Sequence, residues 1–389
     1  MALLTRARRL GRPLTLASLV ALYAVVAVFF AHGGLAYDLH VFWQSARAVG
    51  HGHSPYDPDG LARMSRVARR DLSVPPSNEG WAVYPPVLYV VMVPLGYLPF
   101  ALAAVIGMLV LAAAPFLALR VMGVRDWRCY AAAYASVPVV TTTLLGSISS
   151  LLMLGCALVW RGRGGRLAAA GTIVAKLFLW PLVPLLAVFE GVRRTLAVLA
   201  LALAAAIASW AVFGFADIGR YPSMLSELSA AEAHDSFSLV GMAYAFGAPP
   251  ALGTYLGAAL GLAIAALAVR EARGGRRDAA FTLAIVAALL ASPIVWMHYF
   301  TLLFLPIAAR YPRFNAVWAI PLVPWIGSYW ASDGHWFAFA ATWPWFALVV
   351  ASCLWPAAAS RLAAGLRAAP GRAARRRVVR GSPAPTRGS

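Results

Sequence analysis

Long apolar runs separated by short clusters of arginine constrain this sequence more than any other feature. Runs such as 14–31, 100–120 and 250–269 approach the roughly 20 residues that a helix needs to cross a bilayer. The chain is 61% apolar and 12% charged, whereas soluble domains are about 45–50% apolar and about 25% charged. These values exclude an ordinary soluble protein. We therefore expect an all-α fold, a polytopic membrane helix bundle.

The arginine clusters also predict how the bundle is oriented. The chain has 33 basic residues against 14 acidic ones, a balance that first suggests nucleic acid as a partner. The arginines lie between the apolar runs, however, which is the pattern of cytoplasmic loops in membrane proteins. We therefore expect membrane lipids and no nucleic acid as partners. The run 14–31 is longer than the apolar part of a secretory signal, about 7–15 residues, so it predicts an uncleaved first transmembrane helix.

The same rule divides the chain into a basic cytoplasmic N-terminus (1–13), a transmembrane domain (14–358) and a disordered basic cytoplasmic tail (359–389). Residues 33–83 and 214–249 are expected to be external loops. Because arginine clusters alternate with apolar runs, we expect a multi-pass protein of the cell membrane with about 10–12 spans. Both ends of the chain are expected to lie in the cytoplasm. Prolines interrupt 84–98, so this piece is expected to dip into the membrane. Residues 167–189 should form two short helices that meet near Lys176.

Polar residues on the expected outer side are the candidate functional groups, because ionisable groups at or within a membrane are costly and usually functional. Asp38 heads a predicted interfacial helix that also carries Trp43 and Arg47. A helix N-cap is the alternative role for this aspartate. His298 lies in a predicted external turn that begins at Ser292-Pro293. Its alternative role is that of a solvated or hydrogen-bonded side chain.

Two further candidates lie within apolar segments. Tyr84 precedes Pro85-Pro86, where the alternative reading is a rigid turn. Lys176 is surrounded by apolar residues and needs a carboxylate, carbonyl or lipid phosphate as partner, unless its side chain snorkels to the interface. The pair His51-x-His53 lacks acidic neighbours in a recognised metal pattern, so we expect no metal.

Other sequence patterns exclude several kinds of chemistry. The three cysteines are an odd number and lie in or beside apolar segments, so they predict no disulfide framework. The sequence has no P-loop, no GxGxxG before a helix, no HExxH and no GxSxG. Nucleotide chemistry is therefore unsupported, no cofactor is expected, and any group donor should be carried by a lipid.

The order of the motifs resembles the bacterial polyprenyl-phosphate-mannose-dependent α-mannosyltransferases of glycosyltransferase family 87. The resemblance covers residues 14–358 and is carried by Asp38 before an aromatic-rich helix, Gly52-His53-Ser54-Pro55-Tyr56, Tyr84-Pro85-Pro86, Pro94-Leu95, Leu98-Pro99, Lys176 ahead of Pro181, Ser292-Pro293-x-x-Trp296-x-His298-Tyr299 and a later Pro306. It implies a GT-C architecture with an outward-facing active site. It also implies a catalytic general base, which corresponds to Asp38, and a histidine near the donor phosphate, which corresponds to His298.

The chemistry of such an enzyme agrees with the candidate residues. A polyprenyl-phosphate sugar brings its own leaving group, so the enzyme needs a carboxylate base and positive charge or hydrogen-bond donors at the phosphate. We assign substrate binding to Tyr84, Lys176, Trp43 and Arg47. The predicted reaction moves a mannosyl (hexosyl) residue, with inversion, to a lipid- or glycan-linked acceptor on the outer face. A transporter or flippase of a lipid-linked or small polar substrate is the alternative, although the chain shows no clear internal repeat.

Overall fold

The computed structural model describes residues 2–30, 35–57, 82, 84–326 and 336–355. The expected all-α fold is confirmed, since the elements within these ranges are α-helices and 3₁₀-helices, with no strand among them. In chain order they are α1 (Ala2–Phe30), α2 (Tyr37–Gly50), α4 (Pro86–Gly96), α5 (Phe100–Val121), α6 (Trp127–Ala135), α7 (Val137–Leu145), α8 (Ser149–Trp160), α9 (Gly165–Ala175), η1 (Leu177–Leu179), α10 (Leu182–Glu190), α11 (Val192–Ala211), α12 (Tyr221–Ala231), η2 (Glu232–His234), α13 (Leu239–Ala245), α14 (Pro250–Arg273), α15 (Arg277–Ala291), η3 (Met297–Leu303), α16 (Phe304–Arg310), η4 (Ala316–Ile326) and α17 (Trp336–Leu354).

Few of these helices are long enough to cross a membrane alone. Among the described residues, α5, α11 and α14 pass a test of length and apolar composition. Helices α7 and α8 add a fourth span if the pair, bent by 117°, is counted as one. The shorter apolar stretches of 10–17 residues among the described residues lie in α1, α4, α9, η4 and α17. The fold is that of a polytopic membrane bundle, whereas the count of about 10–12 spans remains a prediction.

Most of the breaks that the sequence predicts within apolar runs coincide with helix ends in the structure. The segment 84–98 contains the short helix α4, and 167–189 divides at Lys176 into α9, η1 and α10. From its sequence alone, the apolar stretch 129–145 reads as a single span, but the structure divides it at Ser136 into α6 and α7. The side chain of Ser136 caps α7 and Pro138 follows in its first turn, which is the combination that starts a new helix.

Helix α2 differs from the interfacial helix expected from its sequence. Its polar side is also buried, with His40 and Gln44 exposed by only 8% and 9%. The neighbouring α4 packs closely enough that a Cβ on Gly96 would lie 2.8 Å from the backbone nitrogen of Arg47. A glycine at this position therefore lets the two helices meet, and α2 becomes part of the bundle interior.

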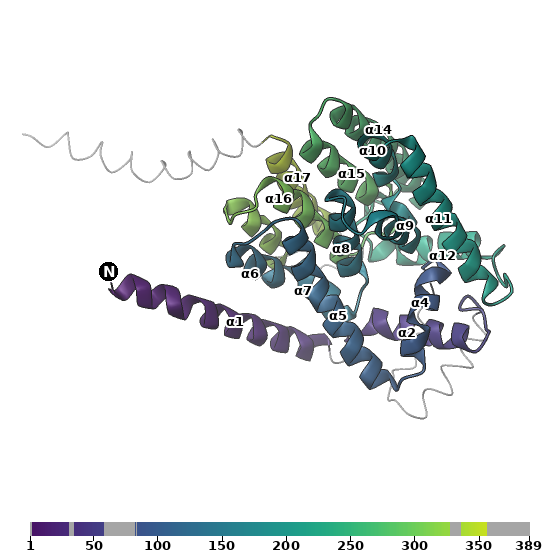
Figure 1. The fold of residues 1–389 in the computed structure, drawn as a ribbon, viewed down its shortest axis with the longest axis horizontal. Helices are drawn as coiled ribbons and strands as arrows, with labels where there is room; N and C mark the ends of the chain where they lie inside the picture. The colour runs from purple at the N-terminus through teal and green to yellow at the C-terminus, as the bar shows by residue number, and fades with distance from the viewer. Residues whose placement is uncertain (1, 31–34, 58–81, 83, 327–335, 356–389) are drawn as a thin grey trace, which may run out of the picture.

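The helices from α2 to α17 pack into one bundle (Figure 1). Helix α1 lies at the edge and contacts α6 and α7, while its N-terminal end extends away from the bundle. Helices α14 and α15 pack against each other on the opposite side. The largest core cluster joins α15, η3 and α8 through residues such as Phe281, Leu303 and Met153. This core fixes the segment that carries His298.

Candidate active site

The bend between α7 and α8 determines where Asp38 lies. Gly146 at this bend has φ +74°, and a Cβ there would lie 2.6 Å from the Cβ of Leu39. The backbone N–H of Ala36 donates a hydrogen bond of 2.7 Å to the carbonyl of Leu144. The start of α2 therefore rests directly on the bend, and Asp38 faces the hydroxyl-rich segment that follows Gly146.

Asp38 is not the cap of its helix. The N-cap of α2 is Ala36, and no side chain caps this end. One carboxylate oxygen of Asp38, Oδ2, is buried without a hydrogen-bond partner among the described residues. Burial raises the pKa of Asp38 to about 6, although a hydrogen bond with Ser147 and the charge of Lys176 act in the opposite direction. The structure thus contradicts the N-cap interpretation and leaves a partly desolvated carboxyl group.

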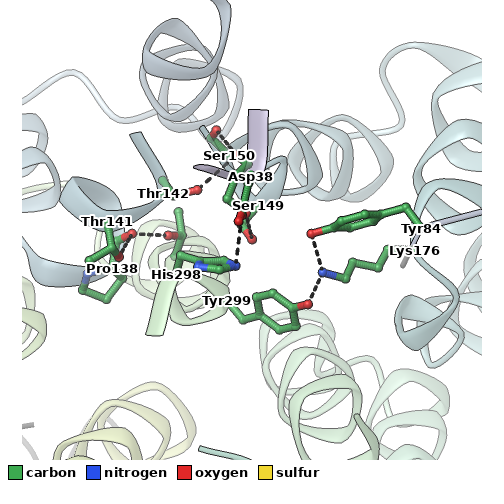
Figure 2. A network of polar contacts seen from close by, with 12 residues as sticks. Asp38, Tyr84, Pro138, Thr141, Thr142, Ser149, Ser150, Lys176, His298 and Tyr299 are labelled. Carbon is green, nitrogen blue, oxygen red and sulfur yellow. Dashed lines mark hydrogen bonds and ion pairs between the residues drawn. The ribbon is translucent and has the colours of Figure 1, made fainter. Parts of the chain in front are cut away.

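His298 faces this carboxyl group from η3. Its Nε2 lies 4.0 Å from Oδ2 of Asp38, with the two side chains 4% and 17% exposed (Figure 2). The hydroxyl of Thr301 donates a 3.1 Å hydrogen bond to the carbonyl of Pro138, which joins η3 to α7. Nε2 of His298 also has no hydrogen-bond partner among the described residues. Buried polar atoms are almost always paired, so these two facing atoms mark a candidate functional site.

Lys176 lies in an apolar segment and was expected to need a polar partner, and the structure gives it two. Its Nζ donates to the hydroxyl of Tyr299 and, at 3.3 Å, to that of Tyr84, and Figure 2 shows both hydroxyls pointing at the ammonium group. The same Nζ lies 3.7 Å from the centroid of the Tyr299 ring. The ammonium group is held inside the protein, which contradicts the snorkelling alternative. Tyr299 was missed as a site residue because its role depends on this contact.

The backbone around Lys176 and Tyr84 explains how they reach the same place. Lys176 ends α9 in an extended conformation with φ −155°, which turns its side chain out of the helix pattern. The carbonyl of Tyr84 accepts a 2.7 Å hydrogen bond from the hydroxyl of Tyr56. The ring of Tyr84 packs against that of Phe42 in α2, with centroids 4.7 Å apart. Tyr84 can therefore belong to the site and also precede the rigid Pro85-Pro86 turn.

Trp43 and Arg47 lie on a different side of α2. The indole N–H of Trp43 donates a 3.0 Å hydrogen bond to the carbonyl of Leu98, and its ring packs against Phe100. The guanidinium of Arg47 lies 5.4 Å from the centroid of the Trp43 ring. These contacts attach α2 to the connection between α4 and α5. The structure does not bring the two residues together with Asp38, so their role in substrate binding remains a prediction.

One carboxylate near the site was not identified from the sequence. Glu232 at the start of η2 is half-buried, and its charge contributes to the raised pKa of Asp38. The sequence placed Glu232 only among several acidic residues of an external loop. Since it lies about 190 residues from Asp38 along the chain, no local pattern could have joined the two.

A cavity of about 460 Å³ lies apart from this site, at the ends of α8, α10 and α15. Its walls include Trp160 and Phe189, and the guanidinium of Arg277 lies 5.2 and 4.7 Å from their ring centroids. None of Asp38, His298 or Lys176 lines it. The arginines at these helix ends match the expected cytoplasmic side, so the cavity and the candidate active site belong to different parts of the bundle.

The fold and the site belong to an integral membrane protein with a buried carboxylate, imidazole and ammonium group close together. Residues 81–293, more than half of the chain, match the model of glycosyltransferase family 87, and the protein belongs to this family. It is therefore a membrane glycosyltransferase. The matched segment contains Tyr84, Lys176 and Glu232, whereas Asp38 and His298 lie on either side of it. No curated protein and no solved structure matches the chain.

Proposed function

We propose that this glycosyltransferase moves a hexosyl residue, mannosyl by family resemblance, from a polyprenyl-phosphate donor to a lipid- or glycan-linked acceptor. The proposed site of reaction is the outer face of the cell membrane. The observation that carries the proposal is the 4.0 Å approach of Asp38 Oδ2 and His298 Nε2, two buried atoms without other hydrogen-bond partners among the described residues. The transporter alternative has no supporting observation in the described part of the chain.

Asp38 is proposed as the general base. The acceptor hydroxyl oxygen forms a bond to C1 of the sugar while its proton passes to the carboxylate of Asp38. The bond between C1 and the phosphate oxygen breaks, and its electron pair leaves with the phosphate. A base works best when its pKa lies near the operating pH, and burial raises the pKa of Asp38 toward that range, to about 6.

His298 and Lys176 are proposed to stabilise the departing phosphate. Fixed donors are most effective where negative charge develops, because they need no reorganisation during the reaction. The ammonium of Lys176 is already held by the hydroxyls of Tyr84 and Tyr299. His298 is fixed through η3 and presents an imidazole nitrogen to the same region. Because phosphate leaves without a proton, one carboxylate suffices.

A single displacement of this kind inverts the anomeric centre. A β-linked sugar phosphate would therefore give an α-linked product. The acceptor approaches opposite the phosphate, so the base and the phosphate-binding groups must act on opposite sides of C1. Asp38 comes from α2, while Lys176 follows α9 and His298 belongs to η3. Separate elements can therefore serve the two sides once the bound sugar holds Asp38 and His298 farther apart than the 4.0 Å of the unliganded site.

The proposal can be tested with the purified protein in phospholipid vesicles. Polyprenyl-phosphate mannose with a radioactive sugar is supplied together with a mixture of membrane lipids and lipid-linked glycans. We expect an α-mannosylated product that wild-type protein forms and that Asp38→Asn forms about 10²–10⁴-fold more slowly. Polyprenyl-phosphate glucose and galactose are assayed in parallel, so that hexosyl transfer with another sugar is also detected. Absence of transfer from all three donors would reject the proposed function.

A further inference from the structure

The proposed reaction makes no use of the cavity at the ends of α8, α10 and α15. Its volume of about 460 Å³ is within the range of small-molecule pockets, about 300–1,000 Å³. Part of its wall is apolar and consists of Leu182, Leu185 and Leu186 of α10, which are buried. The charged side chains on its wall are Arg161, Glu190, Arg277 and Asp278. The cavity therefore combines an apolar wall with groups of both charges.

Two of these charged side chains already have partners within the protein. The guanidinium of Arg161 donates a hydrogen bond to the main-chain carbonyl that follows α5. The carboxylate of Glu190 forms a 3.1 Å ion pair with Arg194. The side chains of Arg277 and Asp278, in the first turn of α15, form no hydrogen bond or ion pair with any described residue. The cavity thus offers one cation and one anion that are free to bind a ligand.

The guanidinium of Arg277 is held in place by aromatic rings. It lies 5.2 Å from the ring centroid of Trp160 and 4.7 Å from that of Phe189. The Trp160 ring in turn stacks on Phe281, with centroids 4.4 Å apart and an interplanar angle of 10°. Because the N–H donors of a guanidinium lie at its planar edge, contact with ring faces leaves them available. Arg277 is therefore positioned to bind an oxyanion, and its fork of donors matches a phosphate.

We propose that this cavity binds the zwitterionic phosphoethanolamine headgroup of a membrane phospholipid, with the phosphate on Arg277 and the ammonium group on Asp278. This inference is independent of the proposed function. The cavity lies at helix ends, where pockets between the helices of membrane proteins bind lipid headgroups. The leucines of α10 give the glycerol and the first methylene groups of the lipid an apolar wall.

The lining of the cavity also distinguishes this headgroup from two others. A quaternary choline is recognised by free aromatic faces, but here the guanidinium and Phe281 already pack against Trp160. A phosphatidylglycerol headgroup has a phosphate without an ammonium group, so it would leave the carboxylate of Asp278 unpaired beside another anion. An ethanolamine ammonium group has three N–H donors and gives this carboxylate a charged partner.

Binding is measured with the purified full-length protein in detergent after removal of bound lipid. Phosphatidylethanolamine, phosphatidylcholine and phosphatidylglycerol with identical acyl chains are titrated, and Kd values are obtained by native mass spectrometry. We expect phosphatidylethanolamine to bind at least about 10-fold more tightly than the other two lipids, the effect of one hydrogen bond to a charged group. Equal affinities for the three lipids, or tighter binding of phosphatidylglycerol, would overturn the proposal.

Arg277→Gln removes the proposed phosphate-binding charge. We expect it to weaken binding of phosphatidylethanolamine by about 10–100-fold, because a charge-assisted bond to the phosphate is lost. Arg273→Gln is the matched control, since Arg273 is an exposed arginine at the end of α14 that does not line the cavity. This control should bind the lipid as wild type does. Equal Kd values for Arg277→Gln and wild type would overturn the proposal.

Asp278→Asn tests the headgroup assignment even if Arg277→Gln fails to fold. The variant should bind phosphatidylethanolamine more weakly and phosphatidylglycerol no more weakly than wild type, so the preference between the two lipids should disappear. A general loss of structure would weaken binding of both lipids, and the melting temperature without lipid checks this. A variant that retains the full preference for phosphatidylethanolamine would overturn the role of Asp278.

A soluble form of the headgroup distinguishes a lipid from a free metabolite. Glycerophosphoethanolamine carries the same phosphate and ammonium groups but has no acyl chains. We expect it to compete with phosphatidylethanolamine at least about 100-fold more weakly than the unlabelled lipid does, because each buried methylene group contributes about 0.8 kcal/mol. Competition as strong as that of the lipid would overturn the assignment to a membrane phospholipid.

Discussion

At Asp38, burial and polar contacts act on the same carboxyl group in opposite directions. Desolvation favours the neutral form, whereas Ser147 and the charge of Lys176 favour the carboxylate. Desolvation is the larger effect, and it raises the pKa to about 6. The residue therefore remains a usable base near neutral pH while having a higher proton affinity than an exposed aspartate.

Asp38→Asn should reduce turnover by about 10²–10⁴-fold, the usual contribution of a general base. Its melting temperature at pH 7 should equal or exceed that of wild type. A carboxyl whose pKa is raised by folding stabilises the fold least when it is charged, and the amide carries no charge. Steady-state transfer rates and thermal denaturation in detergent check both statements. Transfer at a near-normal rate would contradict the catalytic role of Asp38.

The same pKa predicts the pH dependence of the reaction. Asp38 accepts a proton only in its unprotonated form, so kcat/KM should rise as the pH increases through about 6 and level off above it. The profile is measured from pH 4.5 to 8 at saturating acceptor. Residual activity of Asp38→Asn should lack this rise. A wild-type profile that is flat between pH 5 and 7 would be inconsistent with Asp38 as the base.

His298→Ala is expected to weaken use of the donor more than use of the acceptor, because the imidazole acts at the phosphate. We expect the kcat/KM for the donor to fall by about 10²-fold, the loss caused by removing one fixed donor. Initial rates at varied donor and varied acceptor concentrations separate the two effects. Donor kinetics like those of wild type would reduce His298 to a structural side chain.

At the scale of elements, the bend at Gly146 determines how α2 meets α7 and α8. Gly146→Ala places a Cβ 2.6 Å from that of Leu39 and requires an L-residue at φ +74°. Gly162→Ala is a matched control, since Gly162 has φ +62° and no atom within 4 Å of an added Cβ. Both variants have the backbone strain, about 1–3 kcal/mol, but only Gly146→Ala adds the clash. We expect it to have the lower melting temperature and reduced transfer, and equal values would show that the close contact with Leu39 is unimportant.

At the scale of the whole molecule, the arginine clusters predict which surface faces outward. Ser226→Cys in the second predicted external loop and Arg273→Cys at the end of α14 are both exposed positions, and the three native cysteines are buried. In intact cells, a membrane-impermeant thiol reagent should label Ser226→Cys, whereas Arg273→Cys should react only after permeabilisation. The reverse result would invert the topology and place the active site in the cytoplasm.

Much of the architecture follows from the sequence because hydropathy and backbone geometry act over short stretches of chain. The apolar runs predicted an all-helical membrane bundle, and the segment 167–189 divides near Lys176 as expected. Asp38, His298, Tyr84 and Lys176 were recognisable as candidates from their residue types and from the family pattern. Residues 58–81, most of the first predicted external loop, and the predicted C-terminal tail lie outside the described residues.

Only the tertiary structure decided which candidates meet. It brought Asp38 within 4.0 Å of His298 and placed Lys176 between two tyrosines. It also joined the indole N–H of Trp43 to the carbonyl of Leu98 rather than to the site residues. The physical reason is that a helix pattern specifies which residues share a face, whereas the partner of that face depends on packing between segments far apart in the chain.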